Sequence, residues 1–177
     1  MAETALVVLF RQLEPLIGEL RRRYTPSGAE GLAAHVTLIV PFAETPGEFR
    51  VLPAVARTVE RFAPFEVAFR RTARFPATAE DPETLYLAPE PVQRLVALTQ
   101  ALARAIPEFP PYGGKFDEVV PHSTVAQGDD RVLRDAERRL APHLPVTARV
   151  ERVWVVEHAP KGWRRRSAFP LLGREGA

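Results

Sequence analysis

The fold is decided by LAAHVTLIVPF at residues 32–42 and by VVPHSTVAQ at residues 119–127. Both runs are rich in apolar residues, and Gly- and Pro-containing loops precede them, so each predicts a strand. Each run holds a histidine followed two positions later by a threonine, in His35–Thr37 (the first motif) and His122–Thr124 (the second motif). Because side chains alternate faces along a strand, the histidine and threonine of each motif project together, about 7 Å apart.

The segments around the two motifs alternate between strand and helix patterns. Further strands are predicted at residues 4–10, 65–69, 84–87, 146–156 and 167–172. Helices are predicted at residues 14–23, 48–63, 91–106 and about 130–140, where apolar residues recur at helical spacing. This order indicates an α+β fold of two similar halves, each a small antiparallel sheet with helices on its outer face. No long linker separates them, so we expect one two-lobed domain over residues 1–177 with a groove between the sheets.

The composition is that of an ordinary globular protein, since 46% of the 177 residues are hydrophobic and 26% are charged. There is no cysteine, which excludes disulfides, thiolate metal sites and a cysteine nucleophile. Basic residues outnumber acidic ones by only 24 to 22, so an anion site must be local. No apolar run approaches the ~20 residues of a membrane span or forms a signal peptide. We therefore expect a cytoplasmic monomer with no obligate protein partner.

The pairing of the motifs distinguishes His35 and His122 from the other histidines. A single strand histidine is more often structural than catalytic, and a strand threonine is usually only a good β-former. Here, however, two of the four histidines carry the same threonine spacing at matching places in the two halves. His143 and His158 are each followed two positions later by proline, and we expect them in loops or on the surface.

The matched pair resembles the two-histidine phosphoesterase superfamily, which includes the 2'-5' RNA ligase family and cyclic nucleotide phosphodiesterases. The motif of that superfamily, His-x-Thr/Ser-x, occurs twice and is met here by His35-Val36-Thr37-Leu38 and His122-Ser123-Thr124-Val125. Pro41-Phe42 and Val120-Pro121 are also similar to the family, whereas Ser123 stands where the family usually has an apolar residue. The resemblance covers about Thr4 to Leu172 and implies a bilobal fold in which each half gives one motif strand to a cleft.

Such a site predicts hydrolysis of a 2',3'-cyclic phosphate. One proton must leave the attacking water and another must reach the departing ribose oxygen, on opposite sides of phosphorus. Two imidazoles with pKa values near neutrality can act as base and acid, and Thr37 and Thr124 can donate hydrogen bonds to the nonbridging oxygens. Neither a metal nor a cofactor is required. The resemblance implies His122 as the base and His35 as the acid.

Further side chains are candidates for substrate contact. Aromatic rings stack on unpaired bases, which makes Phe42, Tyr86 and Trp163 candidates. The only two lysines, Lys115 and Lys161, lie near predicted strand ends and are candidates for phosphate contact. The run Arg21–Arg23 ends a helix, where positive charge complements the helix dipole without any ligand.

Three alternatives remain open for the same residues. A 5'-hydroxyl could replace water, which would make the reaction a reversible ligation to a 2'-5' linkage. The histidines could instead only bind phosphate, in a noncatalytic module for RNA ends or nucleotides. A histidine metal site is the third alternative, but no His-Glu-x-x-His helix and no carboxylate near either motif supports it. The expected partner is an RNA end or a nucleotide with a cyclic phosphate.

Overall fold

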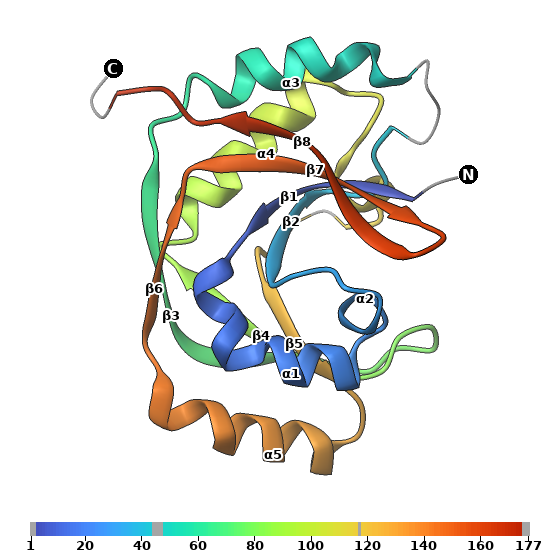
Figure 1. Ribbon diagram of the computed structural model, residues 1–177, viewed down its shortest axis with the longest axis vertical. Helices are drawn as coiled ribbons and strands as arrows, with labels where there is room; N and C mark the ends of the chain where they lie inside the picture. Colours follow the sequence, from blue (N-terminus) through green and yellow to red (C-terminus); the bar gives the residue numbers. More distant parts are fainter. Residues whose placement is uncertain (1–2, 44–47, 117, 175–177) are drawn as a thin grey trace.

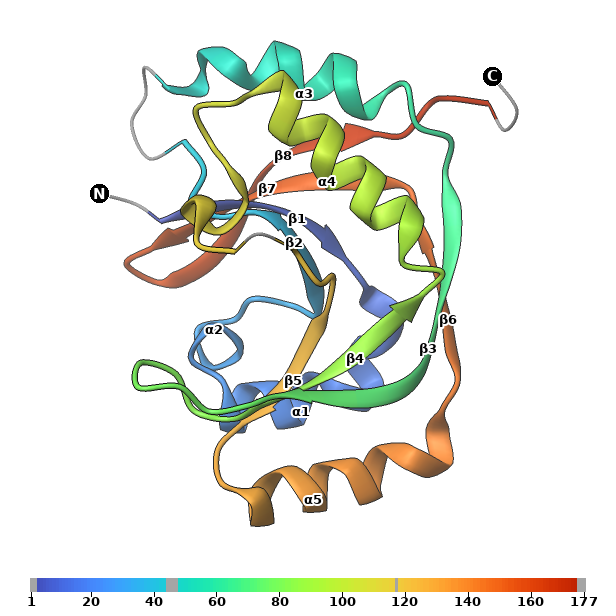
Figure 2. The same cartoon turned by 180° about the vertical axis from the view of Figure 1, so that it is seen from behind.

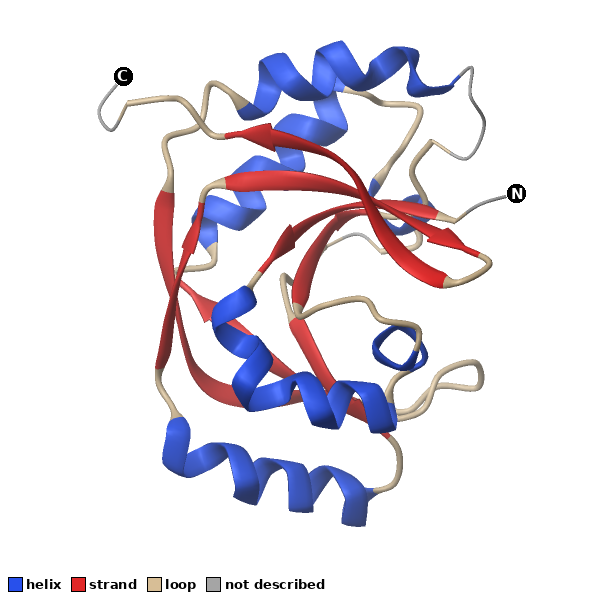
Figure 3. Ribbon diagram, in the orientation of Figure 1, coloured by secondary structure: helices blue, strands red, loops and turns tan. Residues whose placement is uncertain are grey.

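The computed structural model describes residues 3–43, 48–116 and 118–174, and their strands form two four-stranded antiparallel sheets (Figures 1 and 3). The first sheet has the order β2-β1-β7-β8 and the second sheet has the order β5-β4-β3-β6. The strands of the first sheet are β2 (His35–Ile39), β1 (Thr4–Leu9), β7 (Arg152–Ala159) and β8 (Gly162–Pro170). Those of the second sheet are β5 (Ser123–Gln127), β4 (Thr84–Glu90), β3 (Phe65–Phe75) and β6 (Val146–Val150).

The two sheets are built alike around the motif strands. In each sheet the motif strand, β2 or β5, lies at one edge and pairs with a single neighbour, β1 or β4. The first sheet combines strands from both ends of the chain, whereas the second sheet is made from its middle. The α+β architecture with two similar halves, predicted from the order of elements, is therefore confirmed.

Helices join the two halves by crossing between them. Helix α1, which follows β1, packs on β5 of the second sheet, while α4, which follows β4, packs on β2 of the first sheet. Figures 1 and 2 show α3 and α4 on one side of the molecule, with α1 and α5 on the other. The α-helices are α1 (Glu14–Tyr24), α2 (Pro26–Ala29), α3 (Leu52–Val59), α4 (Gln93–Ala105) and α5 (Asp130–Leu140). The 3-10 helices are η1 (Arg11–Leu13), η2 (Glu48–Val51), η3 (Pro111–Gly114) and η4 (Ala141–His143).

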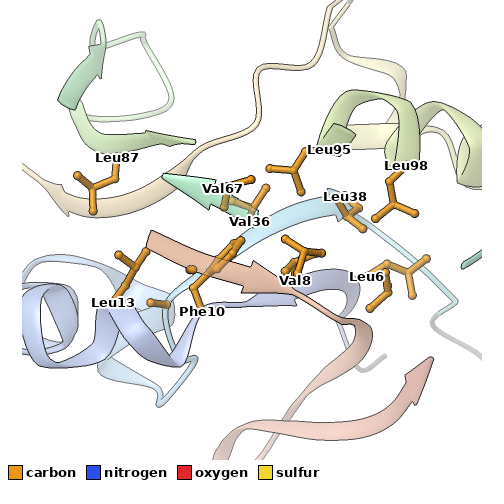
Figure 4. Close-up of a cluster of buried hydrophobic side chains, with 14 of the residues drawn as sticks. Leu6, Val8, Phe10, Leu13, Val36, Leu38, Val67, Leu87, Leu95 and Leu98 are labelled. Atoms are coloured by element: carbon orange, nitrogen blue, oxygen red, sulfur yellow. The ribbon is translucent and has the colours of Figure 1, made fainter. Parts of the chain in front are cut away.

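One hydrophobic core connects the two sheets and the crossing helices (Figure 4). Val36 and Leu38 of β2 contribute to it from the first sheet, and Leu87 of β4 contributes from the second. Phe10 and Phe69 meet edge to face across the interface, with ring centroids 5.1 Å apart. Full burial of such side chains contributes roughly 1.5–3 kcal/mol each, so apolar packing holds the motif strands in place.

The structure corrects the predicted strand at residues 146–156. The chain forms β6 and β7 there, which belong to different sheets and are separated at Glu151. The reason is a change of phase: Ala148 and Val150 face the core before the break, and Val153 and Val155 face it afterwards. The buried positions thus change from even-numbered to odd-numbered residues, and this change allows the chain to pass from one sheet to the other.

No helix within the described residues is long and apolar enough to span a lipid bilayer.

Candidate active site

The strand β2 presents the first motif as alternation predicts. Val36 and Leu38 are fully buried in the core, while His35 and Thr37 lie half-buried on the opposite face. In the neighbouring strand β1, Leu9 lies opposite His35 and Val7 lies opposite Thr37, and the register shifts just beyond Thr37, between Val7 and Leu6. The histidine and the threonine of the first motif therefore share one face of the first sheet.

The second motif differs slightly from the prediction because His122 lies one residue before β5. Its side chain and that of Thr124 are half-buried, whereas Ser123 and Val125 are fully buried on the reverse face. Ser123, the departure from the family motif, thus occupies a core position. Within the part of the chain that the structure describes, its hydroxyl has no hydrogen-bond partner.

A tyrosine outside both motifs connects them. The hydroxyl of Tyr112 hydrogen-bonds Thr37 of the first motif. Its ring lies nearly parallel to that of His122, at an interplanar angle of 20° and a centroid distance of 6.5 Å. Since β2 and β5 are also in contact, the four motif side chains belong to one site at the junction of the sheets.

His35 lies in a surrounding that disfavours its charged form. Its Nδ1 atom is 2.8 Å from the carbonyl oxygen of Ala33, which only accepts, so Nδ1 carries the proton of the neutral ring. Burial, the nearby guanidinium of Arg21 and, to a smaller degree, His122 lower the pKa of His35 to about 3, against the raising effect of the Ala33 hydrogen bond. The neutral ring therefore leaves Nε2 unprotonated.

His122 makes the same backbone contact in a different surrounding. Its Nδ1 atom is 2.8 Å from the carbonyl oxygen of Val120. Phe75 meets its ring edge to face at 4.9 Å, and Tyr86 lies 5.5 Å away and stacks on Phe75. Burial lowers the pKa of His122 below its ordinary value, partly offset by the Val120 hydrogen bond.

A buried arginine lies behind both motifs. Arg21 of α1 is only 1% exposed, and its Nη1 atom donates to the carbonyl oxygen of Thr124 at 2.6 Å. Its Nη2 atom donates to the carbonyl oxygen of Leu32 at 3.1 Å and lies 3.5 Å from Nδ1 of His35. Burial lowers the pKa of Arg21 to about 10, against the raising effect of Glu14, so the side chain is cationic at neutral pH.

Three residues of this site were missed in the sequence. Tyr112 has the left-handed backbone angle φ of 51°, followed by two glycines at 62° and 76°. The Tyr-Gly-Gly run in the loop before the second motif was the available signal, because such angles favour glycine. Burial raises the pKa of Tyr112 to about 12, so its hydroxyl is protonated at neutral pH. Phe75 carries no comparable signal, and Arg21 was hidden in a run of three arginines.

Two of the predicted aromatic contacts have different outcomes. Tyr86 lies beside His122, as described above. Phe42 is 1% exposed and packs edge to face against Phe49 and Phe109, so it belongs to the core. The prediction of a substrate contact by Phe42 is therefore wrong, because a ring closed in by two others presents no face to a base.

The remaining candidates lie outside the contacts that join the motifs. Lys115 is exposed and pairs with Glu80 at 3.1 Å. Lys161 is exposed in the turn between β7 and β8. Trp163 packs against a small apolar cluster on the first sheet, and its backbone nitrogen donates to the carbonyl oxygen of Glu30 at 2.9 Å.

The other two histidines are apart from this site. His143 is exposed in η4, as expected. His158 lies in strand β7 rather than in a loop, and its Nε2 atom is 3.0 Å from a carboxylate oxygen of Glu30. Across the described ranges, no three His, Asp or Glu side chains converge in a way that could hold a metal ion.

The paired His-x-Thr strands at the junction of two antiparallel sheets define the class of two-histidine phosphoesterase folds. The model of the 2'-5' RNA ligase superfamily matches residues 9–162, which include both motifs. The chain therefore belongs to the 2'-5' RNA ligase superfamily, whose members are phosphoesterases and RNA ligases.

Solved structures agree with this fold over nearly the whole chain. The crystal structure of TT0787 from Thermus thermophilus matches with a TM-score of 0.66 and 21% identity, covering 98% of this chain and 100% of that one. The structure of E. coli LigT complexed with 3'-AMP matches with a TM-score of 0.61 and 12% identity, covering 96% and 97% respectively. A comparison with curated proteins gave no match.

Proposed function

We propose that this protein is a metal-independent phosphoesterase that hydrolyses 2',3'-cyclic phosphates of RNA ends or nucleotides to 2'-phosphates. The observation that carries the proposal is the matched state of His35 and His122. Each ring has Nδ1 held by a backbone carbonyl at 2.8 Å, which leaves each Nε2 available for proton transfer. Two such groups are what an in-line displacement at phosphorus requires, one at the entering oxygen and one at the leaving oxygen.

The reaction balances without any further reactant. A water oxygen bonds to phosphorus while the bond from phosphorus to the ribose 3'-oxygen breaks. One imidazole takes the proton of the water, and the other, starting protonated, gives its proton to the 3'-oxygen. Thr37 and Thr124 donate hydrogen bonds to the nonbridging oxygens, where negative charge grows in the transition state. The hydrogen bond between Tyr112 and Thr37 holds the threonine hydroxyl in place beside the phosphate.

Membership of the 2'-5' RNA ligase superfamily favours ligation as a second candidate. In ligation a 5'-hydroxyl would attack phosphorus in place of water, and in the reverse reaction it would be the leaving group, at the same pair of imidazoles. The complex of E. coli LigT with 3'-AMP shows that this relative holds a nucleotide. For the present chain, a nucleotide or an RNA end is accordingly the expected substrate class.

Turnover of 2',3'-cyclic nucleotides in the presence of excess EDTA tests the proposal. We expect hydrolysis that EDTA does not change and a product carrying the phosphate on the 2'-oxygen. Recovery of activity only on adding a divalent metal, or a 3'-phosphate product, would contradict the proposed reaction. Binding without turnover on every cyclic phosphate offered would instead support the noncatalytic module. An RNA with a 5'-hydroxyl, offered together with the cyclic end, tests for ligation.

A further inference from the structure

Arg21 makes polar contacts with both halves of the site from a buried position. It ties α1 to Thr124 of the second motif at 2.6 Å and to Leu32, three residues before the first motif, at 3.1 Å. Its remaining hydrogen bond, to Ser27, is longer at 3.5 Å. The atoms that it contacts at Thr124 and Leu32 are backbone carbonyls, so Arg21 holds the main chain of β5 and of the segment that leads into β2 relative to one helix.

Burial of the Arg21 guanidinium carries an unfavourable desolvation free energy, and a role in the site explains why a charged residue is nevertheless found there. A guanidinium taken out of water loses hydration that only well-placed acceptors restore. Arg21 regains carbonyl acceptors at both Nη atoms, but its Nε atom is buried without a hydrogen-bond partner in the described part of the chain. An apolar residue would fill the same position on the helix face without that cost. The contacts with the two motifs are what an apolar side chain could not provide.

The arginine also makes the two histidines unequal. Their own hydrogen bonds match, because each Nδ1 lies 2.8 Å from the carbonyl oxygen two residues earlier. The ring of His35 has a guanidinium nitrogen 3.5 Å from it, whereas the ring of His122 lies among those of Phe75, Tyr86 and Tyr112. A fixed positive charge beside an imidazole disfavours a second proton on that ring.

We infer that Arg21 is a positioning residue that locks the two motif strands together and keeps His35 neutral, so that His35 is the base and His122 the acid in hydrolysis. This rests on the proposed function. It reverses the roles implied by the family resemblance. In the balanced step, Nε2 of His35 takes the proton of the attacking water, and Nε2 of protonated His122 gives its proton to the ribose 3'-oxygen.

The charges that face His35 support this order. Arg21 faces it from α1 and His122 faces it from the strand β5 side, and both disfavour its protonation. Tyr112, from η3, is neutral at physiological pH. Glu14 lies on the same helix as Arg21 and acts on that guanidinium, while its carboxylate accepts a hydrogen bond from the backbone nitrogen of Ala34. A bound phosphate anion favours the charged form of both rings, and His122, free of the adjacent guanidinium, takes the proton first.

The direct test is an NMR titration of the imidazole carbons in the wild-type protein, with and without inorganic phosphate as the probe. Single His→Gln variants assign the signals. We expect His35 to titrate at lower pH than His122 in both conditions. Titration of His35 at the higher pH would overturn the inference. Because this measurement needs no turnover, it is decided independently of whether the proposed phosphoesterase activity is found.

A set of arginine variants then separates charge from geometry. In Arg21→Met the charge is lost, so the pKa of His35 rises and the acidic limb of kcat/KM moves to higher pH, with kcat reduced tenfold or more. Arg21→Lys keeps the charge but cannot donate to the carbonyls of Thr124 and Leu32 at once, so kcat falls while the acidic limb of kcat/KM stays at the same pH. Arg22→Met, at the exposed neighbouring position of α1, should change neither.

A purely structural arginine would lower kcat without moving the limb, and a folded Arg21→Met protein with an unmoved limb would therefore overturn the inference. Circular dichroism and thermal unfolding establish whether each variant is folded. If Arg21→Met does not fold, the NMR titration of His35 in the wild type and in Arg21→Lys tests the inference instead.

Discussion

His35 and His122 carry the same hydrogen bond to a carbonyl two residues earlier, yet their surroundings differ in kind. The first motif is bordered by a buried cation, Arg21, whereas the second is bordered by the aromatic rings of Phe75, Tyr86 and Tyr112. Similar strands in similar sheets thus place one imidazole beside a charge and the other in a polarisable, uncharged setting. Duplicated strand geometry can therefore still supply the two unequal proton affinities that a base and acid pair needs.

The largest effects are expected when either imidazole is removed. His35→Ala and His122→Ala should each reduce kcat on a 2',3'-cyclic nucleotide by ~10² or more, because general acid or base catalysis commonly contributes that much. His143→Ala, at an exposed histidine outside the site, is the matched control and should leave kcat unchanged. Steady-state kinetics at saturating substrate measure all three. Wild-type activity in either motif variant would remove the assigned role of that ring.

Removal of the motif hydroxyls should have a smaller effect and should be similar on the two sides. Thr37→Ala and Thr124→Ala are each expected to lower kcat about tenfold, corresponding to ~1.4 kcal/mol for one hydrogen bond to growing charge. Thr→Ser variants, which keep the hydroxyl, should lose much less. A strong loss in one motif with none in the other would show that the phosphate lies on one threonine only. Comparison of kcat for the four variants gives the answer.

The tyrosine that joins the motifs is expected to matter less again. Tyr112→Phe keeps the ring against His122 but removes the hydrogen bond to Thr37, which should lower kcat about fivefold for ~1 kcal/mol. In Thr37→Ala the same tyrosine change should have almost no further effect, because its partner is already gone. A double-mutant cycle on kcat measures this coupling. Independent, additive losses would mean that Tyr112 acts elsewhere in the site.

The last prediction concerns the free energy of unfolding in acid, and it distinguishes the two rings without any substrate. His35 has a folded-state pKa of about 3, below the ordinary value of 6.5, so the unfolded chain binds more protons between those pH values. Stability contributed by the neutral ring is therefore complete above pH 6.5 and is lost as the pH falls toward 3.

The variant His35→Gln should accordingly show a weaker fall of the unfolding free energy with decreasing pH than the wild type. His122→Gln should change this slope less, since the guanidinium of Arg21 lies against the other ring. Urea unfolding at about pH 7 and about pH 5 provides the free energies. An equal change of slope in both variants would mean that Arg21 does not make the two histidines unequal.

Much of this site could be predicted from local pattern. Alternation along a strand depends only on backbone geometry, so the shared face of His35 and Thr37 followed from their spacing. Arg21 could not be found in this way, because its partner carbonyl at Thr124 lies 103 residues further along the chain. In the sequence Arg21 is indistinguishable from its exposed neighbours Arg22 and Arg23, and only the packing of α1 on β5 buries one of the three.

The fold shows the same division between local and distant information. The predicted strand at residues 146–156 has the right residues for β-structure, but alternation does not say which sheet a strand joins. The change of burial phase around Glu151 was visible in the sequence and would have indicated two strands. For Phe42 the sequence held no such signal. An aromatic side chain can stack on a nucleobase or pack in the hydrophobic core, and only tertiary contacts distinguish the two roles.

The construction of the first sheet from both ends of the chain has a consequence for the order of events during translation. When residues 1–140 have left the ribosomal exit tunnel, both motifs and Arg21 are outside it, whereas β7 and β8 have not yet emerged. At that stage β1 pairs with β2 alone, and its other edge is open to wrong partners. The nascent protein thus carries every proposed catalytic group before it has the scaffold that orients them, and its maturation depends on the strands made last. Stalled ribosome complexes of increasing length should therefore gain protease resistance in one late step, when β8 emerges.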